Sequence, residues 1–415
     1  MTMSRSSRFV ALFSPIAVFS FSPKIIPTTH YNIKAPSTGT LSAAEISSDT
    51  LLFDRKPSKK DARTDESSTS TSNLSLLDHV NFNVPNHDYI LDFYLDILGC
   101  GLDPRVAVNL MDNDESFGRE GLIWASCGPN QFHFPRDEQA QVLPGHIGLR
   151  YRSLDGLKER LVKASSSTND DSSSVKNNKR HNNKCFDSYE IVVGPSGETI
   201  VQIQDRYGNI FHCREGPEKL TQYRQPVVKI SDQDKFGDVA LRYGVAEESD
   251  CRGIDYVEFD CGMETAEKIA LFYESVFDAT AVVRKNKNGQ TVACIAFGDI
   301  DATTGRASQY LLFRETPSEL PAYDGHHIAI YVGTRDTEDF ERAFQKAQGA
   351  GLLSTNWRDK VDVLTLDAAR SQNQFRIRTV LDVDTGLPIF QLEHEVRSID
   401  HPTWPGVKQS RSSLS

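Results

Sequence analysis

The stretch LLDHVNFNV at residues 76–84 alternates apolar and polar side chains and stops before Pro85. That alternation predicts a strand with one buried face. Asn86 then offers a cap for a helix whose apolar side chains recur at i, i+3, i+4, i+7 and i+8 between residues 90 and 98, the spacing of an amphipathic helix. Gly99 is a typical helix stop. The first folded unit therefore opens as a strand followed by a helix.

This strand and helix occur a second time with the same spacing. The pair Phe93-Tyr94 follows His79 on the expected helix, and the pair Phe272-Tyr273 follows Glu258 at the same distance along the chain. Strands that begin with His146 and His327 then follow at nearly equal distances from those two starting points. Agreement of this kind between two halves of a chain indicates an internal repeat.

Shorter relatives of the unit begin at His146 and His327, so the chain contains four βαβββ modules. We expect an α+β fold in which these modules pair, in chain order, into two domains at residues 74–216 and 253–399, with 217–252 as the linker. The repeat leaves open whether modules pair within one chain or across a homodimer. The strands expected after the helices are, in order, 105–111, 121–127, 131–134, 189–193, 199–204, 209–213, 281–284, 292–297, 309–314, 361–366, 375–380 and 387–393.

Composition narrows the class of protein. The 415 residues carry a net charge of −11, with 38% hydrophobic and 25% charged residues. Soluble globular proteins have similar compositions, and the acidic balance argues against nucleic acid as a partner. No apolar run reaches the roughly 18–20 residues of a membrane span. Seven cysteines without a CxxC pattern are typical of reduced thiols rather than a disulfide framework.

Three segments lie outside the modules or interrupt them. The first 44 residues hold no Asp or Glu but several Arg, Lys and Ser, with an apolar patch at 9–21, as in cleaved targeting segments. We interpret residues 1–73 as a targeting segment and disordered linker, and expect a plastid or mitochondrial location, with cytoplasmic and secretory locations as alternatives. The Ser- and Asn-rich run 164–184 is expected to be a surface loop inside the second module. Residues 400–415 are expected to be a C-terminal tail.

The chain resembles the vicinal oxygen chelate superfamily. The resemblance is carried by the two strand-and-helix starts, the Gly-His-Ile strands, and the segments QFHFPR, LLFRETP, YDGHHIAIYV and LEHEVRSIDHP. That group includes glyoxalase I, extradiol dioxygenases, and the fosfomycin and bleomycin resistance proteins. The resemblance covers most of residues 74–399 and implies that two modules curl into a cup. It also implies a metal-dependent enzyme, of lyase, isomerase or dioxygenase type, acting on a small vicinally oxygenated substrate. The alternative is a non-catalytic small-molecule-binding protein of the bleomycin-resistance type.

The first and last strands of each module in this superfamily offer up to four side chains to one divalent metal. Carried over to the first domain, the resemblance selects four histidines as ligands, which suit zinc, iron, nickel or manganese: His79, His133, His146 and His212. Glyoxalase-like sites mix Gln, Glu and His, whereas dioxygenases use two His and one carboxylate. No carboxylate stands at these four places, so a substrate oxyanion or an outer residue such as Asp78 or Glu120 is expected to serve as the base. The alternatives are that the histidines line a polar pocket without metal, or that they are unrelated core residues.

The second domain offers a weaker set. Glu258, His327 and Glu393 are the candidate ligands, because Leu312 cannot ligate and Glu393 shares the inward parity of the last strand. The alternative for Glu258 is a structural ion pair, since a buried carboxylate needs a partner. Arg314 and Arg397 are candidates to bind a substrate carboxylate, or else they form salt bridges.

Overall fold

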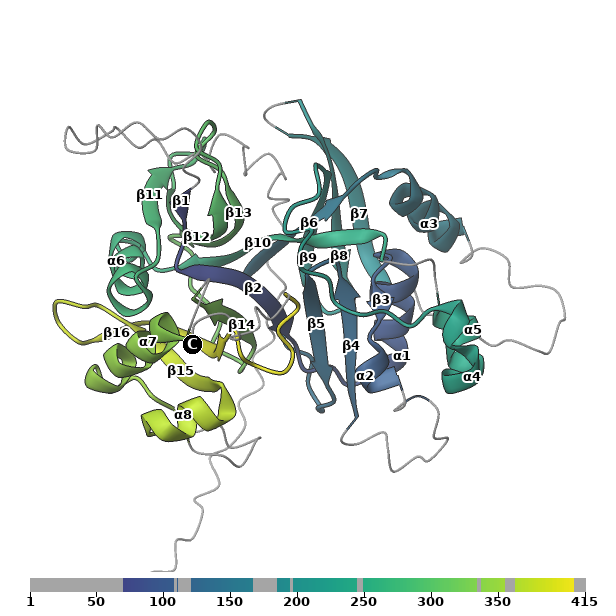
Figure 1. Ribbon diagram of the computed structural model, residues 1–415. Coiled ribbons are helices and arrows are strands. Elements are labelled where there is room, and N and C mark those ends of the chain that lie inside the picture. Colours follow the sequence, from purple (N-terminus) through teal and green to yellow (C-terminus); the bar gives the residue numbers. More distant parts are fainter. Residues whose placement is uncertain are drawn as a thin grey trace, which may run out of the picture. The chain divides into compact units, whose positions relative to one another are not determined.

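The structure is a computed structural model. It describes residues 70–107, 110, 121–166, 185–194, 197–244, 249–333, 337–354 and 363–406. All of these lie in one compact unit that spans residues 42–415. Figure 1 shows the arrangement of its helices and strands. The expected targeting segment, the interior of the 164–184 loop and the end of the C-terminal tail lie outside the described residues, apart from 70–73, 164–166 and 400–406.

Each module begins with a strand and ends with a strand. Module 1 contains β2 (Leu74–Asn81), α1 (His87–Ile90), the π-helical η3 (Leu91–Ile97), β3 (Gly101–Leu102), α2 (Pro104–Ala107), β4 (Leu122–Cys127) and β5 (Asn130–Pro135). Module 2 contains β6 (Gly145–Tyr151), α3 (Asp155–Ser166), β7 (Phe186–Val193), β8 (Thr199–Asp205) and β9 (Ile210–Glu215). Module 3 contains β10 (Cys251–Cys261), α6 (Ala266–Phe277), β11 (Ala281–Lys285), β12 (Thr291–Ile300) and β13 (Ala307–Glu315). Module 4 contains β14 (His327–Val332), α7 (Glu338–Gly349), α8 (Leu366–Gln372), β15 (Gln374–Leu381) and β16 (Pro388–Ser398).

The modules form two mixed sheets. The seven-stranded sheet runs β15-β16-β14-β2-β5-β4-β3 and joins module 4 to module 1. The nine-stranded sheet runs β1-β12-β13-β10-β6-β9-β8-β7, with β11 on β12 and β1 at Ser70–Thr71, and joins module 3 to module 2. In both sheets the first strands of two modules pair antiparallel at the centre, and the last strands flank them in parallel. The expected α+β fold of four paired modules is confirmed.

The partners within each sheet differ from the prediction that modules pair in chain order. Modules 1 and 2 do pack against each other, because Phe93 of η3 contacts Phe211 of β9 and Tyr151 donates to the Leu98 carbonyl. Their strands, however, belong to different sheets. We call each pair of modules that shares a sheet a cup. Each cup therefore contains one module from residues 74–216 and one from residues 253–399.

The segment between the halves explains this exchange. Residues 217–252 are not a bare linker but include η6 (Ile230–Asp232), α4 (Gln233–Phe236) and α5 (Asp238–Tyr243). Their backbone follows module 1, with hydrogen bonds from the Gln225, Val228 and Asp250 amides to the carbonyls of Gly128, Leu102 and Gly99. This path brings the chain back to the middle of the nine-stranded sheet, where β10 pairs with β6. The length of the segment alone does not reveal which modules it allows to pair.

Two predicted strands are wrong where they are described. Residues 104–107 form the helical turn α2, because Pro104 is well suited to a first helical position and has no amide to give to a sheet. Leu366, at the end of the predicted strand 361–366, begins α8, which Thr365 caps by accepting from the Ala368 amide. The other expected strands are present with small shifts of their ends.

The opening strand and helix follow the predicted local rules. Asn86 caps α1 by accepting a hydrogen bond from the Asp88 amide at 2.7 Å. The predicted stripe between residues 90 and 98 is buried. Gly99 has φ +72°, and a Cβ there would lie 2.8 Å from both Arg160 and Asp250. Only glycine fits this stop.

Two buried amides connect the sheets at their centre, where β2 and β10 lie side by side in Figure 1. The Asn130 side chain donates to the Leu77 carbonyl and accepts from the Ile254 amide. The Gln309 side chain accepts from the Leu77 amide and donates to the Ile254 carbonyl. Asn130 is fully buried and Gln309 is 2% exposed, so water cannot replace these bonds.

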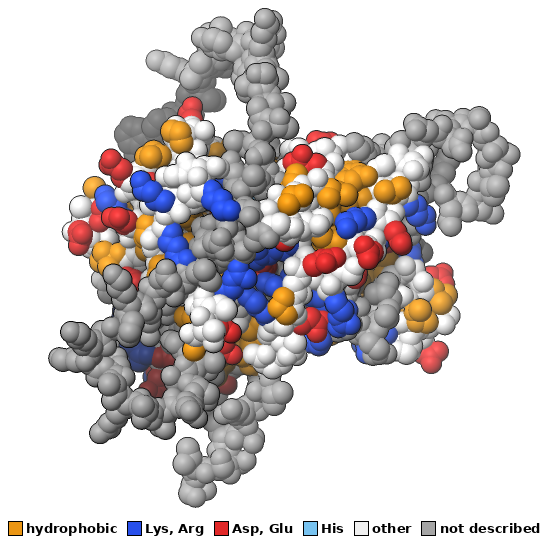
Figure 2. Space-filling view, turned by 90° about the horizontal axis from the view of Figure 1, so that it is seen from above, with side chains coloured by type: hydrophobic (Ala, Val, Ile, Leu, Met, Phe, Trp, Pro, Cys, Tyr) orange, Lys and Arg blue, Asp and Glu red, His pale blue; other side chains and the backbone are white. Residues whose placement is uncertain are grey.

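On the face that Figure 2 shows, described acidic and basic side chains lie interspersed among hydrophobic ones. No helix among the described residues is long and apolar enough to cross a membrane.

We expect Asn130→Ala to lower the free energy of unfolding by about 1–3 kcal/mol, because it removes the side-chain acceptor of the buried Ile254 amide and leaves the Leu77 carbonyl with only the longer bond from Gln309. Urea unfolding at neutral pH measures the change. Gln222→Ala, at an exposed turn, is the control and should change stability by less than about 0.5 kcal/mol. A similar small change for Asn130→Ala would mean that the two sheets do not depend on this clamp.

Candidate metal centre

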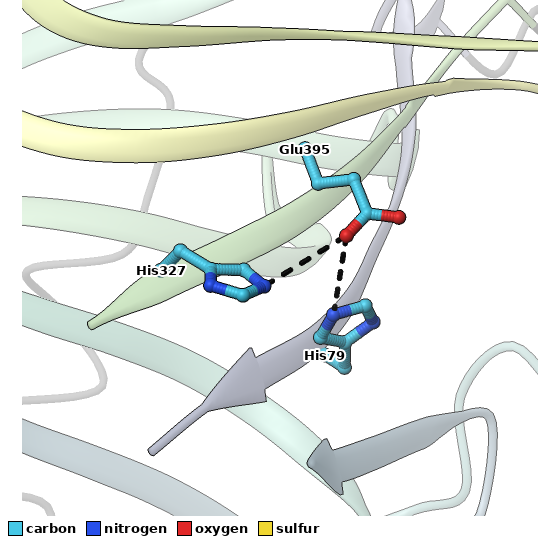
Figure 3. Close-up of side chains that lie close together, drawn as sticks. All are labelled: His79, His327 and Glu395. Carbon is cyan, nitrogen blue, oxygen red and sulfur yellow. Dashed lines mark ion pairs between the residues drawn. The ribbon is translucent and has the colours of Figure 1, made fainter. Parts of the chain in front are cut away.

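Three side chains from three strands converge in the seven-stranded sheet. His79 on β2, His327 on β14 and Glu395 on β16 point toward one another in Figure 3. Glu395 Oε2 lies 4.0 Å from His79 Nε2 and 3.8 Å from His327 Nε2, and one ligand atom from each residue lies within 4.8 Å of the others. Two ligands of one ion, with bonds of about 2.1 Å, stand roughly 3 Å apart. Small side-chain movements therefore bring this set into coordination distance.

Strand register produces the convergence. His79 is opposite Ala329 and His327 is opposite Asn81, so the two imidazoles form a diagonal pair on one face of the central antiparallel strands. His327 is opposite Glu393 on the parallel strand β16. Glu395 is two residues further and so points to the same face.

Asp78 fixes the tautomer of His79. Asp78 Oδ2 lies 2.9 Å from His79 Nδ1, and a carboxylate only accepts, so Nδ1 carries the proton. Nε2 is then an unprotonated nitrogen, and it is buried without a hydrogen-bond partner. Burial lowers the pKa of His79 and outweighs the opposing effect of Asp78. A neutral imidazole whose second nitrogen donates to a carboxylate is a typical metal ligand.

Glu395 belongs to a chain of alternating charges. Arg376 bonds both Glu393 and Glu395, and Arg397 bonds both Glu395 and Asp78. Burial opposes ionisation of Glu395, but Arg376 and Arg397 outweigh it and hold its pKa well below the usual range. The carboxylate is therefore ionised, as metal binding requires. Its Oε2, which faces the imidazoles, also accepts from Arg376 at 2.8 Å.

His133 on β5 lies beside the three ligands. Its ring stacks on His79 with centroids 3.7 Å apart and on Trp124 with centroids 4.5 Å apart. The Gln131 amide nitrogen donates to Asp103, so its oxygen accepts from His133 Nε2 at 3.2 Å. His133 Nδ1 is then the unprotonated nitrogen. Burial, His79 and Arg397 hold the pKa of His133 well below its usual range.

A cavity of about 820 Å³ opens next to these residues. Its wall includes His133 and His327, with Arg376 and Arg397 of the charge chain and His401 from the segment after β16. Cavities of this size accommodate small-molecule ligands. Of the three converging side chains, His327 and Glu395 line this cavity, whereas His79 is fully buried.

The four histidines predicted as one site are divided between the two sheets. His79 and His133 lie in the seven-stranded sheet, whereas His146 and His212 lie on β6 and β9 of the nine-stranded sheet. The prediction that they converge is therefore wrong, because each cup contains one module from each half of the chain. The carboxylate that seemed to be missing comes from module 4.

The second predicted set is divided in the same way. Glu258 lies on β10 of the nine-stranded sheet, while His327 and Glu393 lie in the other sheet. Glu393 has the predicted inward parity but is bound to Arg376 and Arg378 at 2.9 Å each. Glu395, two residues further on the same face, is the carboxylate that reaches the histidines. The alternation of side chains along the last strand indicated which face the carboxylate lies on. Which residue of that face reaches the histidines depends on the pairing of β16 with β14.

The cup of modules 2 and 3 has the same strand pairing as the cup of modules 1 and 4, but different side chains at the equivalent positions. His146 is opposite Glu258, so Glu258 takes the register position of Asn81, and Tyr256 takes that of His79. His212 uses both ring nitrogens, at 2.9 Å from the Tyr256 hydroxyl and 3.0 Å from Gln202 Oε1. Among the described residues of this cup, no three ligand atoms lie close enough together to hold an ion.

The remaining predicted residues form buried ion pairs. Arg314 contacts Glu258 at 3.3 Å and Asp260 at 2.7 Å, in agreement with the structural alternative for Glu258. Arg397 binds Asp78 and Glu395 and also lines the cavity. Asp78, considered as a base, is instead occupied by His79, Arg397 and Gln225. Glu120 lies outside the described residues.

Comparison with known proteins gives remote structural similarities only. No family model matches the chain, and no curated protein matches its sequence. Among solved structures, a "putative dioxygenase" from Bacillus subtilis is similar over 81% of this chain and 87% of its own, with 14% identity and a TM-score of 0.47. Glyoxalase I from Zea mays is similar over 78% of this chain and 92% of its own, with 12% identity and a TM-score of 0.42. A trihydroxybiphenyl dioxygenase from Sphingomonas wittichii covers 78% and 90%, with 11% identity and a TM-score of 0.23.

The chain has four βαβββ modules in two shared sheets, with the first and last strands of paired modules side by side. This is the arrangement that the sequence resemblance to the vicinal oxygen chelate superfamily implies. At 11–14% identity and TM-scores below 0.5, the solved structures assign neither a family nor an activity. The seven-stranded sheet of modules 1 and 4 carries the candidate metal centre.

We expect stability to fall as the pH falls below neutrality. Burial lowers the pKa of His212 to about 3 and that of His394 to about 4, whereas an unfolded histidine titrates near 6.5. The unfolded chain therefore binds more protons, and the stability present above about pH 6.5 is lost toward pH 3–4. Each such histidine contributes up to about 1.4 kcal/mol per pH unit in that window.

Urea unfolding at pH 7.5, 6 and 5 measures this slope. The slope should be smaller for His394→Gln, which removes one of the titrating groups outside the metal centre. Equal stability of the wild-type protein from pH 7.5 to 5 would contradict the expectation.

Proposed function

We propose that the chain is a metal-dependent enzyme of the dioxygenase type, in which His79, His327 and Glu395 hold a divalent ion. The observation that carries the proposal is the convergence of these three side chains beside a cavity. Two histidines and one carboxylate with open positions form the usual ligand set of non-haem Fe(II) oxygenases. We therefore favour iron over zinc, nickel or manganese.

The residues present fit such an ion. The buried Nε2 of His79 has no hydrogen-bond partner, and burying such a nitrogen is costly unless a ligand satisfies it. The two imidazoles and one carboxylate compensate only one of the two charges of a divalent ion. An anionic oxygen of the substrate is suited to compensate the other. Bound iron would supply a Lewis acid that binds neighbouring substrate oxygens and dioxygen.

The protein residues have their own roles in this proposal. Asp78 holds His79 in the ligating tautomer, and Arg397 holds Asp78. His133 lines the cavity with its Nδ1 unprotonated, so this nitrogen is available to accept a hydrogen bond from a substrate hydroxyl. Burial holds the pKa of His133 well below its usual range and so keeps the ring neutral. Arg376 and Arg397 keep Glu395 ionised.

Glu395→Gln should weaken metal binding by more than about 100-fold, because it removes the charged ligand but conserves side-chain size. Glu393→Gln is the matched control on the same strand and face, and should change the dissociation constant by less than about tenfold. Titration of the metal-free protein with Mn(II) or Fe(II), under anaerobic conditions for iron, measures both. If both substitutions have equal effects, the assignment of Glu395 as the ligand is wrong.

After anaerobic loading with Fe(II), we expect the protein to consume dioxygen when it is given catechols, one molecule per molecule of substrate. Both oxygen atoms enter the product in such a reaction, so no external reductant is needed. His327→Ala should lower this rate at least about 1,000-fold. An oxygen electrode and mass spectrometry of the products provide the measurement.

Two other outcomes separate the alternatives. A metal-loaded protein that converts a vicinally oxygenated substrate without consuming dioxygen would favour a lyase or isomerase. A protein that binds a small molecule in this cavity but takes up no metal would favour the non-catalytic binding type.

A further inference from the structure

One residue that lines the cavity, Asn81, has a side-chain amide with no role in the metal centre described so far. Asn81 follows His79 by two residues on β2, and its register partners are His327 on one side and His133 on the other. It lines the cavity and is only 3% exposed, yet its Nδ2 has no hydrogen-bond partner. Burying a donor without a partner destabilises the folded protein. Its presence beside the metal centre therefore requires an explanation.

A second donor without a partner lies close by. Trp124 is the register partner of His133 on β4 and also lines the cavity. Its indole Nε1 is buried and has no hydrogen-bond partner. Indole nitrogen only donates. The two side chains thus place two uncommitted N–H groups around His133.

The indole ring is held in place by its neighbours. His133 stacks on one face with centroids 4.5 Å apart, and the Arg105 guanidinium lies 5.0 Å from the ring centroid. Arg105 is itself bound to Asp103 and to Gln225. A ring fixed in this way loses little entropy when its N–H binds a ligand.

The other cup provides an internal comparison. The register position of Asn81 is taken there by Glu258, which contacts Arg314 at 3.3 Å and His146 at 3.4 Å. The register position of His133 is taken by Leu312. The same frame is thus filled by protein charges in one cup, whereas in the other it presents neutral donors to a cavity.

We propose that Asn81 and Trp124 together bind a carbonyl oxygen of the substrate, separate from the two oxygens that the metal centre takes. The substrate class is then a vicinal diol or catechol that bears a neighbouring acyl group. A neutral carbonyl fits better than a carboxylate, because the cavity arginines Arg376, Arg378 and Arg397 are all bound to protein carboxylates. This inference rests on the proposed function, in which the metal centre binds the two hydroxyl oxygens of the diol. It adds a substrate-positioning role for Asn81 and Trp124.

Calorimetric titration of the full chain with two probes, catechol and its ortho-acetyl derivative, tests the proposal. Zn(II) loading prevents turnover, and the same titrations are repeated on the metal-free protein. We expect the acetyl derivative to bind about 10–100-fold more tightly than catechol, as for one or two hydrogen bonds of roughly 1.4 kcal/mol each. Trp124→Phe keeps a stacked ring, and Asn81→Leu keeps the volume. Each should remove most of this preference and change catechol affinity by less than about threefold.

Trp404→Phe is the matched control, because Trp404 packs on Tyr331 and Tyr223 and does not line the cavity. It should keep the full preference. Thermal unfolding of each variant verifies that it is folded, with Asn81→Ala as a second test at that position. Equal binding of the two probes by the wild-type protein, retention of the preference in both variants, or tighter binding of the ortho-carboxylate derivative would overturn the inference. Failure to bind metal would contradict the proposed function alone, since the acetyl preference is also measured without metal.

Discussion

The antiparallel pairing of β2 with β14 is the constraint on which the candidate site depends. It brings the first strand of the first module against the first strand of the last module, although modules 2 and 3 separate them in the chain. His79 and His327 become neighbours only through this pairing, and β16 adds Glu395 because it runs parallel to β14. A shift of one residue in either register would turn a ligand to the opposite face of the sheet. The buried amides of Asn130 and Gln309 help to fix the position of β2 against β10.

Electrostatics then determines what the converging side chains can do. The alternating chain from Arg378 through Glu393, Arg376, Glu395 and Arg397 to Asp78 gives each buried charge at least one opposite neighbour. Burying isolated charges would be far more costly than burying such a series. The same chain keeps Glu395 ionised and directs the His79 proton to Nδ1. The same ion pairs therefore stabilise this part of the protein and keep Glu395 and His79 in the protonation states that suit a bound cation.

Local sequence patterns predicted the modules well, because strand alternation and helix stripes depend on neighbours within a few residues. The errors at 105–111 and near Leu366 also have local causes, a proline at a first helical position and a threonine cap. The composition of the site was harder to predict, since it depends on which modules share a sheet. His79, His133 and His327 were recognised as candidates, but they were grouped with residues of the wrong cup. Glu395 was missed by two residues on the correct face, because the register of β16 is set by β14 and not by its own sequence.

The two cups show how one frame supports different chemistry. Both place the first strands of two modules antiparallel and flank them with last strands, but the side chains at equivalent register positions differ. Tyr256 in place of His79 gives the second cup a hydroxyl, which occupies His212. Glu258 in place of Asn81 introduces a charge, which Arg314 compensates. The first cup retains His79 Nε2, Asn81 Nδ2 and Trp124 Nε1 without a hydrogen-bond partner, and the second cup retains His146 Nε2 in the same state. The difference is that Asn81 and Trp124 line a cavity. Because buried polar groups without partners destabilise a fold, a ligand in this cavity that satisfies the two donors would remove that cost.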